Sequence, residues 1–187
     1  MNEVKRYLIG EPAFFGNEKF LHFGTEVHRA ILEPEKEPSH TFNNEEMERI
    51  TAMTKAAKEH PNVKYDLARS DKEQSVYGYI EGVKFRIILD MQHTFDCPVR
   101  FGADLKTTSV RTEAAFMKSA REYGYFRQVY VYKTVGGLDV SRIYALQKKA
   151  PFSIYTIDSS RFIGEMIAAE EEVKMLISII KKSGRFN

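Results

Sequence analysis

The sequence predicts a single domain of the α/β (α+β) class, in which helices pack on a mixed central sheet. Its length of 187 residues suits one compact domain. Segments with the apolar spacing of helices alternate along the chain with segments that have the two-residue period of strands. The sequence contains no internal repeat and no linker rich in Gly, Ser or Pro. We therefore expect one domain over residues 1–187.

Two amphipathic helices open the expected order of elements. The first covers residues 24–32 and ends before Pro34, where residues 32–39 form a loop. The second covers residues 43–60 and is bounded by Asn43 as its cap and by Pro61 as its end. Glu46, three residues after Asn43, completes a capping box. Both segments place apolar side chains at helical spacing, so each is expected to cover one face of the sheet.

Three strands occupy the middle of the chain. Residues 75–80 and 83–91 flank Glu81-Gly82, and this arrangement predicts a tight hairpin. A third strand is expected over residues 100–106. The sheet core is therefore expected to be built from consecutive strands.

The remaining elements alternate between helix and strand. Residues 112–135 are expected to form a helix that kinks at Gly124. Short strands follow at 141–146 and 152–157. A last helix begins at residue 158 or 159, and Gly184 lies past its end.

Composition excludes several classes of protein. There are 28 Lys and Arg residues against 26 Asp and Glu, a formal charge of +2, so no polybasic tail is present and a nucleic-acid contact would need a local patch. The single cysteine, Cys97, excludes an internal disulfide, a four-cysteine zinc site and a cysteine-held iron–sulfur cluster. No stretch is long and apolar enough for a membrane span, and no secretory leader is expected. The use of a single cysteine favours the reducing cytoplasm as the location.

Acidic and basic side chains converge on two of the middle strands. Asp104 and Lys106 are two residues apart and therefore project from the same face of their strand. Asp90 ends the preceding strand, so neighbouring strands would bring two carboxylates and one ammonium together. Carboxylate oxygens suit Mg²⁺ or Mn²⁺, and a lysine beside such an ion can orient or deprotonate a water that attacks a phosphodiester.

Ordinary explanations exist for the same residues. An Asp-x-Lys tripeptide is common, and it can form a salt bridge on an exposed strand. The basic side chains after the third strand can track a phosphate backbone, although a solvated charged face is the more frequent explanation. These basic residues are Arg111, Lys118, Arg121, Arg127 and Lys133.

Four motifs in order resemble the PD-(D/E)XK nuclease superfamily. Gly24-x-x-x-His28 resembles the first motif of its RecB-type branch, and Asp90 followed by Asp104-x-Lys106 resembles the nuclease signature. Gln128-x-x-x-Tyr132 resembles the last motif of that branch. The Leu-Glu-Pro that ends at Pro34 and the run 104–108 are most similar to the exodeoxyribonuclease VIII (RecE-like) catalytic domain of phage and prophage. The resemblance covers residues 22–133 and implies a restriction-endonuclease-like sheet flanked by helices.

The resemblance assigns a role to each motif residue. It implies that His28, Asp90, Asp104 and the backbone carbonyl of Leu105 bind the metal, with Asp90 and Asp104 also counted as catalytic, and that Lys106 is the catalytic lysine. The metal that it implies is Mg²⁺ or Mn²⁺.

Gln128 and Tyr132 lie four residues apart, on one face of a helix. By the resemblance this pair lies at the active site and orients the lysine or the DNA strand, whereas its ordinary role is to be one polar and one aromatic side chain on a partly buried helix.

Two positions depart from the family pattern. RecE-like domains often have Arg-Pro-Asp at the second motif, whereas this chain has Ile88-Leu-Asp90, with Arg86 four residues before the aspartate. An acidic residue often opens the second-motif hairpin, and Glu73 is the candidate for it.

The implied function is a metal-dependent exonuclease acting on linear double-stranded DNA in phage or prophage recombination. The implied partners are duplex DNA ends, a single-strand annealing protein and further copies of the chain in a ring. Three alternatives stay open: a nuclease fold that binds nucleic acid without cutting it, a structure-specific endonuclease and a single-strand exonuclease.

Overall fold

The computed structural model describes residues 18–93 and 98–183, so Cys97 and the expected helix stop at Gly184 lie outside the described residues. The elements in order are α2 (Glu18–Leu32), α3 (Asn44–Glu59), α4 (Pro61–Arg69), β1 (Ser70–Ile80), β2 (Val83–His93), β3 (Phe101–Thr108), α5 (Glu113–Glu122), α6 (Tyr125–Val135), β4 (Val140–Gln147), β5 (Ile154–Asp158) and α7 (Ile163–Lys182). None of the described helices is long and apolar enough to cross a membrane.

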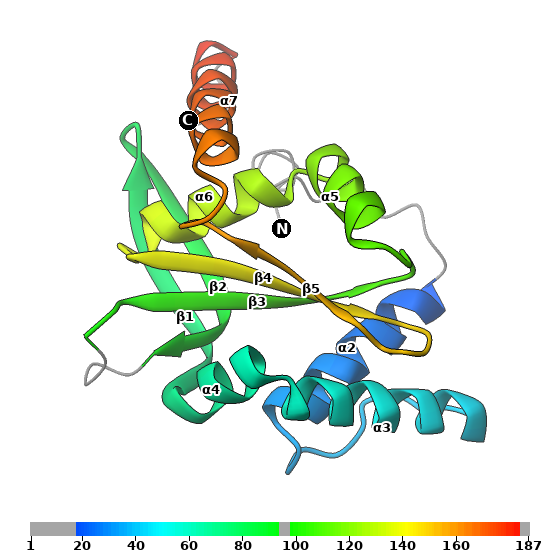
Figure 1. Ribbon diagram of the computed structural model, residues 1–187. Coiled ribbons are helices and arrows are strands. Elements are labelled where there is room, and N and C mark those ends of the chain that lie inside the picture. Colours follow the sequence, from blue (N-terminus) through cyan, green and yellow to red (C-terminus); the bar gives the residue numbers. More distant parts are fainter. Residues whose placement is uncertain (1–17, 94–97, 184–187) are drawn as a thin grey trace.

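The five strands form one mixed sheet, which confirms the expected fold class. They lie side by side in chain order, with β3 and β4 parallel and all other neighbours antiparallel. Figure 1 shows α2, α3 and α4 on one side of this sheet and α5, α6 and α7 on the other. The parallel step from β3 to β4 needs a crossover connection, and α5 and α6 supply it.

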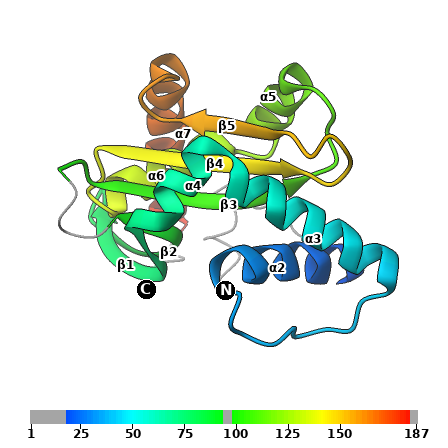
Figure 2. The same ribbon diagram turned by 60° about the horizontal axis from the view of Figure 1, so that its bottom comes forward.

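The layer of α2, α3 and α4 is seen from the front in Figure 2, where α2 and α3 run side by side beneath β3. Val27, Ile31 and Leu32 of α2 are buried in its core, as the periodicity of the sequence predicts. Asn43 and Glu46 form the expected capping box, in which each side chain bonds to the backbone N–H of the other residue. This layer places α2 against the middle of the sheet.

The opposite layer holds the β1–β2 hairpin in a fixed position. Side chains of α6 and α7 pack on Phe85, Ile87 and Leu89 of β2. Gly78 of β1 lies so close to α6 that a Cβ at this position would stand 2.5 Å from the carbonyl oxygen of Val135. Glycine therefore permits the close approach of β1 to the end of α6.

The structure corrects three expected boundaries. Pro61 starts α4 rather than only ending α3, and His60 serves both as the C-cap of α3 and as the N-cap of α4. Proline fits the first turn of a helix because its missing N–H would have no intrahelical partner there. The segment 112–135 is two helices, α5 and α6, because Gly124 adopts a left-handed conformation with φ +70°. The last helix begins at Ile163, after a turn that follows β5.

A polar network is buried under the sheet on the α4 side. The carboxylate of Asp66 accepts hydrogen bonds from the Tyr144 hydroxyl at 2.5 Å and from the Arg142 guanidinium at 3.1 Å. The His93 ring nitrogen Nε2 lies 3.2 Å from the same carboxylate. Arg142 also donates to Asp158 at 2.6 Å. The network joins α4 to three strands through side chains that are far apart in the sequence.

Candidate active site

Asp90 lies at the point where β2 separates from β3. The two strands pair in register only at Met91 with Ala103 and Gln92 with Gly102. Continued by one step, this register puts Asp90 opposite Asp104. The backbone N–H of Leu105 donates to Oδ2 of Asp90 at 2.6 Å, so a side chain of β2 takes up a donor of β3 where the two backbones diverge. Both carboxylates are buried, with 7% and 5% of Asp90 and Asp104 exposed.

Asp104 and Lys106 project from the same face of β3, as their spacing predicts. The Lys106 ammonium lies 2.8 Å from Oδ2 of Asp104. Burial is the largest single effect and lowers the pKa of Lys106, but Asp104, Tyr132 and Asp90 together raise that pKa above its usual value. The structure therefore holds a cation directly beside the two buried carboxylates.

Gln128 and Tyr132 of α6 form a chain of contacts that ends on Asp104. The amide of Gln128 donates to the Tyr132 hydroxyl at 2.8 Å, and that hydroxyl lies 3.5 Å from Oδ1 of Asp104. Burial, followed by the charge of Asp104, raises the pKa of Tyr132, so the phenol keeps its proton. Tyr132 thus contacts the Asp104 carboxylate directly, and Gln128 reaches it only through the Tyr132 hydroxyl.

His28 reaches the site from α2, in the opposite helical layer. Its Nδ1 lies 3.6 Å from Oδ2 of Asp90. Burial lowers the His28 pKa to about 4, so the imidazole is neutral at physiological pH. A neutral imidazole has a free lone pair and can serve as a metal ligand.

Glu73 of β1 is a further acidic residue at this site. The hairpin register pairs Lys72 with Met91 and Gln74 with Leu89, which places Glu73 opposite Asp90. The backbone of Glu73 has φ +52°, an unfavourable conformation for a residue with a side chain. Burial and the charges of Glu33 and Asp104 raise its pKa. The sequence indicates this position of Glu73 through the hairpin, because a regular register counted back from the turn at residues 81–82 pairs position 73 with position 90.

The electrostatic balance of the site favours a bound cation. Burial and the neighbouring charge of Asp104 raise the pKa of Asp90 well above its usual value, although the Leu105 N–H and Lys106 act in the opposite direction. The site offers the carboxylates of Asp90 and Asp104, the nearby carboxylate of Glu73 and the neutral imidazole of His28. Carboxylates and imidazoles are donor types that bind Mg²⁺ or Mn²⁺. Within residues 18–93 and 98–183, no three such side chains have the mutual distances that coordination of one metal ion requires. The residues fit a divalent ion by chemistry, with the carboxylates now held by Leu105 and Lys106.

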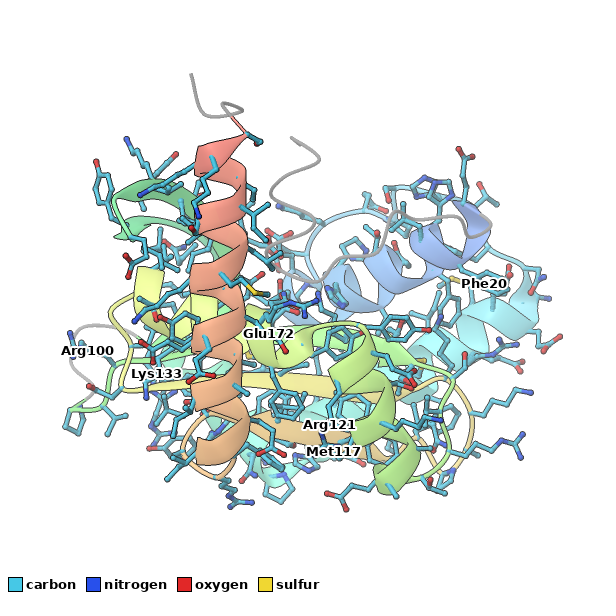
Figure 3. The ribbon with its side chains drawn as sticks, turned by 90° about the horizontal axis from the view of Figure 1, so that it is seen from above. Phe20, Arg100, Met117, Arg121, Lys133 and Glu172 are labelled. Carbon is cyan, nitrogen blue, oxygen red and sulfur yellow. The ribbon has the colours of Figure 1, made fainter. Side chains whose placement is uncertain are left out.

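Other predicted residues lie elsewhere. The Leu105 side chain points into the core on the α2 and α3 side, so only its backbone faces Asp90. The basic residues of α5 and α6 are largely engaged in ion pairs, in which Arg121 binds Glu165 and Arg127 binds Glu172. Figure 3 shows Arg121 on α5, facing α7, the helix that carries Glu172.

Comparisons with known proteins agree with the observed fold. The family model that matches residues 11–184 describes a PDDEXK-like domain of unknown function (DUF3799). The chain is similar to a solved structure from Eubacterium rectale named "Putative exonuclease", with 16% identity, a TM-score of 0.67, and coverage of 97% of this chain and 74% of that one. No curated protein matches the sequence.

Two further solved structures give weaker matches. A phage-related exonuclease from Haemophilus somnus 129PT has 13% identity and a TM-score of 0.42, with 95% of this chain and 94% of that chain covered. An alkaline exonuclease from Laribacter hongkongensis has 10% identity and a TM-score of 0.41, with 98% and 93% covered. At these values the likeness adds nothing to the fold that the family match establishes.

Proposed function

We propose, from the premise that this chain belongs to the family of PDDEXK-like domains of unknown function (DUF3799), that it is a metal-dependent deoxyribonuclease acting on the ends of linear duplex DNA. The observation that carries the proposal is the meeting of His28, Asp90, Asp104 and Lys106, which come from α2, β2 and β3. An ordinary surface salt bridge would need neither a buried pair of carboxylates nor an imidazole from the opposite layer.

The proposed reaction is hydrolysis of a phosphodiester bond, in which a water oxygen bonds to phosphorus and the ester oxygen leaves with a proton. A divalent ion would be held by His28, Asp90, Asp104 and the Leu105 carbonyl, and it would polarise the phosphate and acidify a bound water. Mg²⁺ and Mn²⁺ are the expected ions because hard oxygen donors dominate the set.

The protein side chains have separate tasks in this proposal. Lys106, fixed by Asp104, orients the attacking water and offsets the negative charge that develops on the phosphoryl oxygens. Gln128 and Tyr132 keep the Asp104 carboxylate in one orientation through their hydrogen-bonded chain. Asp104 is therefore held from two sides, by β3 and by α6.

The biological setting proposed from the sequence resemblance is phage or prophage recombination in the cytoplasm. There the enzyme would shorten one strand from a duplex end and leave single strand for an annealing protein. A ring of several copies around the DNA belongs to the same proposal, and the mass of the protein in solution tests it.

Digestion of linear duplex DNA tests the proposed activity. We expect the wild type to release nucleotides with Mg²⁺ or Mn²⁺ and not with EDTA. Asp104→Ala and Lys106→Ala should each lower the rate at least about a hundredfold, because each removes a group that stabilises transition-state charge. A matched control is Asp139→Ala, which breaks the exposed 3.0 Å ion pair with Arg100 and should leave the rate unchanged.

Three outcomes would contradict the proposal or narrow it. Equal cleavage by the wild type and both site variants would overturn the assigned active site. Salt-sensitive DNA binding without cleavage would identify a binding module on a nuclease fold. Cleavage of closed circular DNA at the same rate as linear DNA would identify an endonuclease instead.

A further inference from the structure

The outer face of the β1–β2 hairpin carries a row of exposed aromatic and basic side chains. Tyr77 and Tyr79 of β1 are 58% and 65% exposed. In the register of the hairpin Tyr77 lies opposite Arg86, and Tyr79 lies opposite Lys84. Both basic residues are exposed. Two neighbouring pairs along the hairpin therefore each combine one aromatic ring with one cation.

This face is left open by the helices that hold the hairpin. Alternate residues of β2, namely Phe85, Ile87 and Leu89, point inward against α6 and α7. Their neighbours Lys84, Arg86 and Ile88 point the other way and are exposed. Figure 3 shows the hairpin projecting beyond the body of the sheet beside the C-terminal half of α7.

The same face leads to the candidate active site. Side chains alternate along a strand, so Lys84, Arg86 and Ile88 share their side of β2 with Asp90. Across the hairpin, Tyr77 and Tyr79 follow Glu73 at even spacing on β1. At about 3.3 Å per residue, the row extends about 20 Å outward from Asp90. A nucleic-acid strand that enters the candidate active site can therefore continue over the hairpin.

The cations of this row are free to bind an external anion. Lys84 lies over the Tyr77 ring at 5.5 Å, and Arg86 donates to the Ser75 hydroxyl at 3.0 Å. Within the part of the chain that the structure describes, neither cation has an acidic partner. This differs from Arg121 and Arg127, whose charges are offset by glutamates of α7.

We propose that the outer face of the β1–β2 hairpin binds a single-stranded DNA segment that extends from the active site. The proposal rests on the proposed function and names where the substrate strand lies. Lys84 and Arg86 contact its phosphates, and Tyr77 and Tyr79 stack on its bases. Single strand fits better than duplex because only unpaired bases expose their flat faces to an aromatic side chain.

Fluorescence anisotropy of labelled oligothymidine, measured in EDTA so that no cleavage occurs, tests the row. We expect Tyr77→Ala/Tyr79→Ala to weaken binding about tenfold or more, and Tyr77→Phe/Tyr79→Phe to bind like the wild type, because stacking needs the ring alone. Lys84→Ala/Arg86→Ala should lower the slope of log affinity against log salt by about 1.4, since each phosphate contact on a single strand contributes about 0.7.

The matched control lies on α4. There Tyr65 is 53% exposed and packs against Arg69, with 3.8 Å from the guanidinium to the ring centre. Tyr65→Ala/Arg69→Ala removes the same chemistry from a different surface and should leave the affinity unchanged. The Tyr77 and Tyr79 changes should lower the affinity for blunt duplex DNA much less than the affinity for oligothymidine.

A direct contact measurement keeps the proposal testable whatever the variants do to folding. Ultraviolet cross-linking of the wild type to an oligonucleotide containing bromodeoxyuridine should attach DNA to peptides from residues 70–93. Cross-links confined to other peptides would overturn the proposal. So would wild-type protein that does not bind oligothymidine, or tyrosine variants that bind it within about twofold of the wild type.

The outcomes also separate this inference from the proposed function. Metal-dependent cleavage with hairpin-independent binding would overturn the inference alone. Hairpin-dependent binding without any metal-dependent cleavage would overturn the proposed function alone. If the tyrosine changes alter the mass of the protein in solution and not its DNA affinity, the hairpin contacts a second copy, and the inference is wrong.

Discussion

Two clusters of buried charge lie on the sheet of this protein, and they are built differently. Around Asp66, the carboxylate is met by Tyr144, Arg142 and His93, and the Arg142 charge is shared with Asp158. Around Asp90 and Asp104, two carboxylates face each other, with one ammonium and one neutral imidazole between the helical layers.

The pKa values show the difference. Burial acts against the charge of Asp158, yet hydrogen bonds from Ser160 and Arg142 lower its pKa, so that carboxylate is stabilised in its ionised form. Burial and Asp104 instead raise the pKa of Asp90. A network that satisfies its charges holds a fold together, whereas carboxylates whose pKa is raised by burial and by each other are typical of functional sites.

The largest expected effect is on the free energy of unfolding when one carboxylate is replaced in each of the two clusters. Asp66→Ala should lower the free energy of unfolding by about 3 kcal/mol, because it leaves buried donors without their acceptor. Asp90→Asn should raise the free energy of unfolding at neutral pH, since a carboxyl whose pKa is raised by folding costs stability wherever it is ionised. Urea unfolding in EDTA measures both variants.

The control for this pair is the wild type at about pH 4, where the unfolded carboxyl begins to take up its proton. At this pH the difference in free energy of unfolding between Asp90→Asn and the wild type should be smaller than at neutral pH. A loss of stability in Asp90→Asn at neutral pH as large as that of Asp66→Ala would show that the two clusters do not differ in this way.

A second prediction concerns the imidazole of the site. Because the His28 pKa is lowered to about 4 by burial, the unfolded chain takes up a proton on this residue before the folded protein does. Stability from His28 is therefore complete above its unfolded pKa of 6.5 and is lost as the pH falls towards 4. Between neutral pH and about pH 5 the wild type should lose about 2 kcal/mol more than His28→Gln.

Urea unfolding of both proteins at several pH values in EDTA gives this difference. The NMR signals of the His28 ring provide an independent check, because their titration midpoint should lie near pH 4. Titration of that ring near pH 6.5 would contradict the expectation.

The smallest expected effect sharpens the contrast between buried and exposed charge. Arg121 of α5 donates to Glu165 of α7 at 2.7 Å, on the surface. Arg121→Ala should change the free energy of unfolding by less than about 1 kcal/mol, because exposed ion pairs gain little in water. Its oligothymidine affinity should equal that of the wild type, and a clear decrease would show that α5 also contacts DNA.

Local signals predicted most of the fold and the central part of the site. The turn at Glu81-Gly82, the cap at Asn43 and the shared face of Asp104 and Lys106 follow from backbone geometry over a few residues, and the structure has all three. The membership of the chain in the PDDEXK-like family confirms the resemblance seen in the motifs. The metal and catalytic roles of the site residues stay predictions.

Features that depend on distant packing were missed. Pro61 is compatible with a helix end and with a helix start, and only the packing of α4 on β2 decides between them. The Asp66 network draws on residues 66, 93, 142, 144 and 158, whose polar side chains look unremarkable one by one. The strand expected at residues 75–80 extends back to Ser70, because the hairpin register continues past the positive φ of Glu73.

The contact at Gly78 connects the hairpin to a helix of the candidate active site. The same α6 that touches β1 there also carries Gln128 and Tyr132, which bear on Asp104. A single helix therefore contacts both the hairpin and the β3 carboxylate, and a side chain at position 78 would push β1 away from it. His28 comes from α2 in the opposite layer, so among the side chains around Asp90 and Asp104 it is the one whose position does not depend on the contact between β1 and α6.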